Sequence, residues 1–150
     1  MDPINIIAKM SAGTFSDVMS VSRRQVREIL FAQLGIKSKS KSLLKNLQQK
    51  KEERIAALHD SLKHASSKRD ADICRELIRS WLYTKRPLLK SALDYLNVPN
   101  DDGLIEIEPT VFGELSKEKA TSLYDHLCKD FDKEHVAIYL EFMETKNLSL

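Results

Sequence analysis

Histidine and cysteine are the residue types in this chain most able to bind a metal or perform catalysis, and their spacing favours neither. His59 and His64 are five residues apart, which places them on different faces of a helix. His126 and Cys128 are also on different faces, and His135 lies beyond a predicted helix boundary. We therefore expect these histidines to lie at the surface or at the edge of the core, without a metal.

Local motifs for catalysis and for nucleotide binding are missing from the sequence. The four glycines stand at positions 13, 35, 103 and 113, too far apart for a phosphate-binding loop or a nucleophile elbow. A calcium loop centred on Gly103 would need ligands at Val98 and Pro109, and neither carries a carboxylate. The sequence therefore predicts a protein that is not an enzyme and that holds no cofactor and no metal.

The elements that must position any functional side chain are predicted to be helices almost throughout. Asp2 before Pro3 predicts a helix start, and Gly13 the end of that helix. Ser22 with Gln25 predicts a capping box for a further helix, which Gly35 would end. Apolar residues at helical spacing mark the expected inner faces: Phe15, Val18, Met19, Val26, Ile29, Leu30, Leu44, Leu47, Ile55, Leu58, Leu62, Cys74, Leu77, Ile78, Trp81, Leu88, Leu89, Ala92, Leu93, Ala120, Leu123, Leu127, Val136 and Leu140.

The predicted fold class is all-α, a six- to seven-helix bundle with one short extended or hairpin loop near residues 97–113. Residues 100–103, Asn-Asp-Asp-Gly, predict a turn within that loop. Residues 1–35 are expected to form a small helical subdomain, residues 36–42 a Lys/Ser linker and residues 43–150 the bundle. A single domain over the whole chain is the alternative.

Residues 12–34 carry a pattern that could bind DNA. Phe15, Met19, Val21, Val26 and Ile29 occupy positions that would clamp two short helices together, Ser16 is small where the helices would touch, and Ser20 occupies the turn. The pattern resembles the helix-turn-helix motif of bacterial DNA-binding proteins, although that motif usually has Ala and Gly at the two serine positions. The resemblance implies that the second helix reads the major groove and that the following lysines contact phosphate. The candidate residues are Ser22, Arg23, Arg24, Arg27, Lys37, Lys39 and Lys41.

Charge is distributed unevenly along the chain. Residues 35–69 hold ten Lys and Arg against three Asp and Glu, whereas residues 97–150 hold five against twelve. A long helix from Leu44 to Leu62 carries much of the basic charge, and Lys51 interrupts its apolar stripe. We expect this helix to bind another protein or a second copy of the chain, through Lys45, Lys50, Lys51 and Arg54.

The sequence thus predicts a non-catalytic protein that acts by binding another macromolecule, with a DNA-binding regulator as the alternative. We expect it in the cytoplasm, because the chain shows neither a signal-peptide pattern nor an apolar run long enough to span a membrane. Cys74 and Cys128 are accordingly expected to be reduced.

Overall fold

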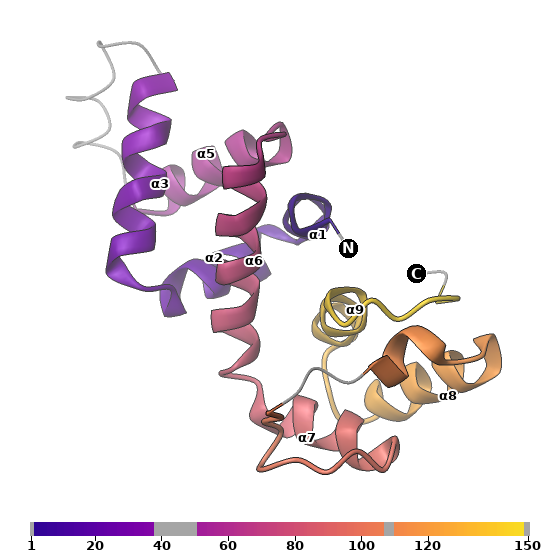
Figure 1. Cartoon of the computed structure of the whole chain (residues 1–150). Coiled ribbons are helices and arrows are strands. Elements are labelled where there is room, and N and C mark those ends of the chain that lie inside the picture. Colours follow the sequence, from indigo (N-terminus) through magenta and orange to yellow (C-terminus); the bar gives the residue numbers. More distant parts are fainter. Residues whose placement is uncertain (1, 38–50, 107–109, 149–150) are drawn as a thin grey trace. The chain divides into compact units, whose positions relative to one another are not determined.

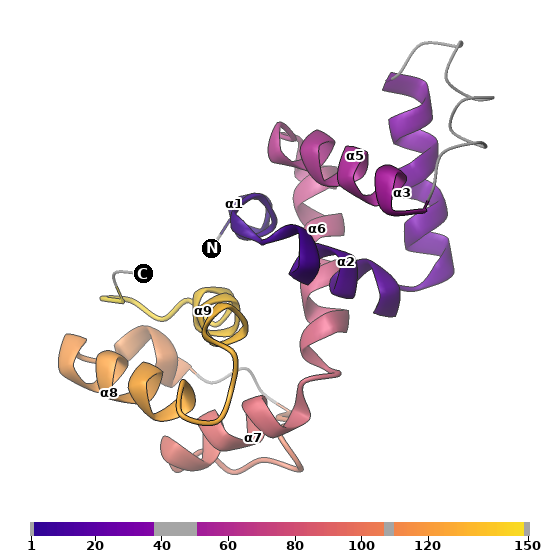
Figure 2. The ribbon, with the colours of Figure 1, turned by 180° about the vertical axis from the view of Figure 1, so that it is seen from behind.

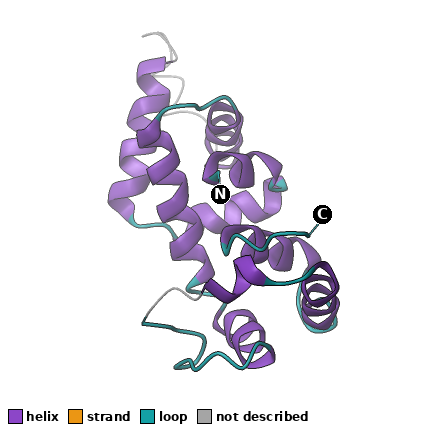
Figure 3. Cartoon of the chain, turned by 45° about the vertical axis from the view of Figure 1, so that its right-hand side comes forward, coloured by secondary structure: helices purple, strands orange, loops and turns teal. Residues whose placement is uncertain are grey.

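The computed structural model describes residues 2–37, 51–106 and 110–148, and this part of the chain is helical. It contains eight α-helices and one 3-10 helix, one or two more than the sequence pattern predicts, and no β-strand (Figure 3). The predicted all-α fold class is confirmed. The described residues form two compact units, residues 2–81 and residues 82–148.

The first unit is built around α5 (Lys51–Lys63). Helices α1 (Pro3–Lys9), α2 (Ala12–Val21) and α3 (Arg24–Lys37) all pack against α5 (Figure 1). The same arrangement is seen from behind in Figure 2, with α6 (Lys68–Leu82) as the remaining helix of the unit. Because α1, α2 and α3 all pack against α5, the side chains on α3 and α5 are held in fixed positions relative to one another.

Helix starts in the first unit follow the predicted capping logic at two places. The Asp2 carboxylate accepts a hydrogen bond from the Ile4 amide at 3.0 Å, and Pro3 begins α1. The Ser67 hydroxyl accepts one from the Asp70 amide at 3.1 Å, close to the start of α6. The first contact confirms the helix start expected at Asp2, and the second shows that the Ser67 side chain caps the start of α6.

The helix ends predicted at the first two glycines are wrong. The Ser11 hydroxyl caps α2 through the Thr14 amide, so Gly13 lies in the first turn of that helix and not at the end of α1. Gly35 lies within α3, which continues to Lys37. Because two further helical residues follow Gly35, it does not act as the predicted helix stop.

The core of the first unit contains one polar ring. His59 is buried, its Nε2 lies 2.8 Å from the Ile7 carbonyl oxygen, and its ring stacks on Phe15 with centroids 4.3 Å apart. These contacts attach α5 to α1 and to α2. Apolar residues from the helices complete the core: Ile6, Val18, Met19, Leu30, Ile55, Leu58, Leu62, Cys74, Leu77, Ile78 and Trp81.

The second unit contains α7 (Arg86–Tyr95), the 3-10 helix η1 (Thr110–Glu114), α8 (Lys117–Leu127) and α9 (Lys133–Phe142). Side chains cap two of these helices: the Ser116 hydroxyl accepts a hydrogen bond from the Lys119 amide, and the Asp132 carboxylate accepts hydrogen bonds from the Glu134 and His135 amides. Helix α8 packs against both α7 and α9. The buried residues are mainly those expected from the apolar spacing: Leu88, Leu89, Ala92, Leu93, Ala120, Leu123, Leu127, Val136 and Leu140.

The loop after α7 forms the predicted turn. The amide of Asp101 donates to the Leu104 carbonyl at 2.8 Å, and the amide of Leu104 donates back to the Asp101 carbonyl at 2.9 Å. The Asn100 side chain accepts a bond from the Gly103 amide. The expected extended segment is thus one isolated bridge within the described residues, and residues 107–109 lie outside them.

Residues 36 and 37 of the predicted linker lie within α3. Residues 38–50 lie outside the described part, so the rest of the linker and the boundary at residue 42 stay predictions. Within that part, the helices of residues 2–37 pack with α5, so they belong to the same unit as residues 51–81. None of the described helices combines the length and the apolar character needed to cross a membrane.

Candidate functional site

The segment between α2 and α3 differs from the capping box predicted there. Ser22 ends α2, and its buried hydroxyl donates a hydrogen bond to the Met19 carbonyl oxygen at 2.7 Å. Helix α3 begins two residues later, at Arg24. Ser22 is therefore not the N-cap of α3, and its hydroxyl proton is not directed to solvent, where a phosphate would be.

Several side chains expected to hold α2 and α3 together face solvent. Ser16, expected at the contact between the two helices, is exposed. Val21 and Ile29, expected in the apolar clamp, are 37% and 43% exposed. Phe15 and Met19 are buried as expected. Helices α2 and α3 do not pack as an isolated pair, however, because each of them also contacts α5.

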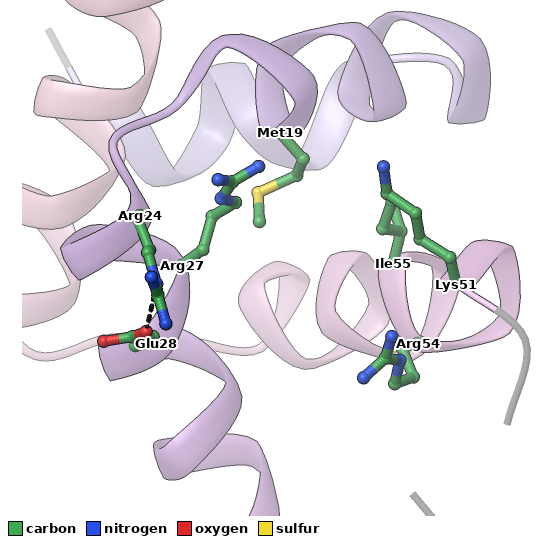
Figure 4. A pocket seen from close by; sticks show the side chains of 7 residues that line it. All are labelled: Met19, Arg24, Arg27, Glu28, Lys51, Arg54 and Ile55. Atoms are coloured by element: carbon green, nitrogen blue, oxygen red, sulfur yellow. Dashed lines mark hydrogen bonds and ion pairs between the residues drawn. The ribbon is translucent and has the colours of Figure 1, made fainter. Parts of the chain in front are cut away.

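Four basic residues that the sequence analysis assigned to two different sites surround one pocket. Arg24 and Arg27 come from α3, and Lys51 and Arg54 come from α5. Met19 reaches in from α2, and Ile55 and Glu28 complete the lining (Figure 4). We call this site the basic pocket. Its volume is about 240 Å³.

Helical spacing accounts for the convergence of these side chains. Arg24 and Arg27 are three residues apart on α3, as are Lys51 and Arg54 on α5, so each pair shares one helix face. The packing of α3 against α5 brings the two faces together. Pairs that are far apart in the sequence thereby line the same concave surface.

The basic pocket has a strong excess of positive charge. Glu28 is its one carboxylate, and it accepts a bond from Arg24 Nε at 2.8 Å. Four cations against one anion leave a formal charge of +3 on the lining. Met19 and Ile55 are mostly buried in the core, and the part of each that lines the pocket is an apolar wall, which strengthens the attraction of an anion that enters.

The other residues predicted to bind DNA or a protein are not brought into this pocket. Arg23 is exposed but does not line it. Lys37 is the last residue of α3. Lys39, Lys41, Lys45 and Lys50 lie outside the described residues.

A second, shallower pocket lies between α3 and α6 and lacks a dominant charge. Lys68 and Arg69 face Asp72 and Glu76 there, with Val26 and Ile73 as the apolar lining. Asp72 is already paired with Arg75 at 3.2 Å. Balanced charges give this pocket little preference for an anion or a cation.

His126 and Cys128 of the second unit interact with aromatic side chains. His126 stacks on Tyr95 with ring centroids 4.7 Å apart. The Cys128 thiol is hydrogen-bonded to the hydroxyl of Tyr124, and this bond raises the pKa of Tyr124. Within the described residues, no three His, Cys, Asp or Glu side chains are grouped closely enough to hold a metal ion.

Sequence reasoning missed the apolar lining of the basic pocket. Met19 and Ile55 read as ordinary core residues because their spacing matches the inner faces of their helices. The spacing of the arginines and lysines did indicate two basic faces. No sequence signal showed that α3 and α5 pack with these faces adjacent.

Comparisons of the chain with protein-family models, with curated proteins and with solved structures find no match.

Proposed function

We propose that this protein is a non-catalytic binding protein of the cytoplasm whose basic pocket receives an acidic segment of another protein. The observation that carries the proposal is the convergence of Arg24, Arg27, Lys51 and Arg54 on one concave site with an apolar wall. A segment with carboxylates on both sides of an apolar side chain matches this lining. The carboxylates pair with the basic rim, and the apolar group contacts Met19 and Ile55.

The size of the pocket supports a peptide rather than a cofactor. Pockets for drug-sized ligands and cofactors usually have volumes of about 300–1,000 Å³. The basic pocket, at about 240 Å³, is smaller than this range and accommodates one or two side chains. Its lining also lacks histidine, cysteine and serine, so Lys51 and the paired Glu28 are the only lining side chains with a nucleophilic or basic group suited to catalysis.

Binding of duplex DNA is the alternative proposal, and the geometry favours it less. A helix-turn-helix protein presents its second helix as a convex surface to the major groove. In this chain the Ser22 hydroxyl is bonded to the Met19 carbonyl, and Arg27 lines a concave site. Exposed Arg23 and Arg24 remain the residues that such binding would use.

The test compares two probes on one set of variants by fluorescence anisotropy. The first probe is a labelled peptide with a central Leu-Leu pair flanked by Glu and Asp, and the second is a random duplex DNA with the same label. The pocket variant is Arg24→Glu/Lys51→Glu. Both residues are exposed and lie in the first turn of a helix, where an acidic side chain is tolerated.

The matched control is Arg23→Glu/Arg69→Glu, which changes the net charge equally at exposed positions outside the basic pocket. We expect the wild type to bind the peptide, the control to bind it as well, and the pocket variant to lose about ten-fold or more in affinity. Loss of peptide binding in both variants would mean that net charge alone attracts the peptide. Tight DNA binding that the control variant abolishes would favour the DNA-binding alternative.

A further inference from the structure

The two units of the chain carry opposite charges. Residues 2–81 contain sixteen Lys and Arg against nine Asp and Glu, a net charge of +7. Residues 82–150 contain eight against thirteen, a net charge of −5. The boundary between the packing units is therefore also a boundary between a basic and an acidic half, and each half of one copy complements the opposite half of another.

The acidic unit contains one loop whose chemistry matches the basic pocket. Asp101, Asp102 and Glu106 are exposed, and Leu104 and Ile105 between them are half-buried. We call residues 101–106 the acidic loop. It presents carboxylates on both sides of two partly accessible apolar side chains, which is the pattern that the basic rim and the apolar wall of the pocket require.

The acidic loop is held in one conformation before any partner binds. The bridge between Asp101 and Leu104 closes it, and Arg86 donates a bond to the Asp102 carbonyl at 3.3 Å. Gly103 has a φ of +83° and lies against the backbone of α7. Because residues 101–104 are already held by these contacts, this part of the loop loses little conformational entropy when it docks.

We propose that the basic pocket binds the acidic loop of a second copy of this chain, so that the protein self-associates. This inference rests on the proposed function and names the partner. The carboxylates of Asp101 and Glu106 take part in no ion pair within the described residues, so both are available to the arginines and lysines of the pocket. Leu104 and Ile105 supply the apolar contact with Met19 and Ile55.

Sedimentation velocity of the full chain over a concentration series tests the proposal. At low salt we expect the mean mass of the wild type to rise with concentration, and at about 1 M salt, where the screening length is about 3 Å, we expect monomer. The pocket variant Arg24→Glu/Lys51→Glu and the loop variant Asp101→Lys/Glu106→Lys should each weaken self-association about ten-fold or more. The matched controls are Arg23→Glu/Arg69→Glu and Asp125→Lys/Asp130→Lys, which change exposed charges elsewhere and should still associate.

Mixing the two weakened variants gives the sharpest result. The loop variant retains a wild-type pocket, and the pocket variant retains a wild-type loop, so each mixed pair can form one intact contact. We expect the mixture to associate at concentrations at which each variant alone is monomeric. Circular dichroism of each variant confirms that it is folded.

Three results would overturn the inference: a monomeric wild type at every concentration, self-association that survives both variants, or a mixture that stays monomeric. A loop that occupies the pocket of its own chain gives the first of these results. The proposed function fails separately, when the pocket variant binds the acidic peptide as tightly as the wild type does. A monomeric wild type whose pocket still binds the peptide would therefore remove the second copy as the partner and keep the pocket.

Discussion

The indole of Trp81 shows how one polar atom can hold a core residue in place. Trp81 is fully buried, and its Nε1 donates a hydrogen bond to the Asp17 carboxylate at 2.7 Å. The apolar spacing of α6 predicts that Trp81 is a core residue, and the structure confirms it. The sequence could not show the partner, because Asp17 reads as a solvent-exposed residue on a short helix 64 positions away.

Replacing Asp17 with Ala should destabilise the first unit. The change leaves the buried indole N–H without its acceptor, and an unsatisfied buried donor costs about 1–3 kcal/mol. Trp81 is the only tryptophan in the sequence, so urea unfolding followed by its emission reports the effect directly. Asp17→Asn retains an acceptor and should recover part of the loss. An Asp17→Ala protein as stable as the wild type would show that the bond contributes nothing.

The buried thiol of Cys74 should make the first unit less stable at alkaline pH. Burial, together with the nearby carboxylates of Asp70 and Asp2, raises the pKa of the Cys74 thiol from 9.0 to about 12. Between these pH values the unfolded chain loses the thiol proton and the folded chain keeps it. Stability is therefore lost as the pH rises from about 9 toward 12.

This pH dependence is measured by unfolding the wild type and Cys74→Ala in urea between pH 8 and pH 11. Cys74→Ala should be less stable at pH 8, because it leaves a small cavity, and its stability should fall less steeply with pH. Equal slopes for the two proteins would contradict the expected protonation of Cys74. The same burial predicts that the folded wild type protects Cys74 from alkylating reagents at pH 8.

At the scale of the elements, a pair of glycine substitutions should have opposite effects. A Cβ at Gly103 would lie 2.9 Å from the Arg86 carbonyl oxygen and from the Lys90 amide nitrogen, and the φ of +83° disfavours any L side chain. Gly103→Ala should therefore cost about 1–3 kcal/mol or more in the second unit. A Cβ at Gly13 meets only the Ser11 hydroxyl, at 4.0 Å, so Gly13→Ala should stabilise α2 by up to about 1 kcal/mol.

Thermal unfolding followed by circular dichroism checks both glycine variants. The two changes add the same methyl group, so a difference in sign isolates the backbone conformation and the space around it. If Gly103→Ala were as stable as the wild type, the loop could not be held against α7 as the structure places it. If Gly13→Ala were strongly destabilised, Gly13 could not lie within a helix.

Helix existence was predictable from the sequence, and several helix ends were not. Caps that depend on one side chain and one nearby amide, such as those of Asp2, Ser116 and Asp132, follow from local sequence. The ends predicted at Gly13 and Gly35 were wrong because a glycine can also lie within a helix at a modest cost: Gly13 in the first turn of α2, and Gly35 inside α3. Ser22 was misassigned because the same hydroxyl can end one helix or begin the next.

At the scale of the whole molecule, the basic pocket depends on helices that are distant in the sequence. Two basic faces could be predicted from residue spacing, one on α3 and one on α5. Their meeting around Met19 and Ile55 is a property of tertiary packing, which local pattern does not specify. The opposite charges of the two halves are visible in the sequence, but the division at residue 81 required the structure.

The most direct test of the basic pocket is an amide chemical-shift titration of the isotope-labelled wild type with the acidic Leu-Leu peptide. The largest shifts should occur at Arg24, Arg27, Lys51, Arg54 and around Met19, and the pocket variant Arg24→Glu/Lys51→Glu should lose them at the same peptide concentration. Shifts confined to α7, α8 and α9, or shifts that persist in the pocket variant, would contradict the assignment of the basic pocket as the binding site.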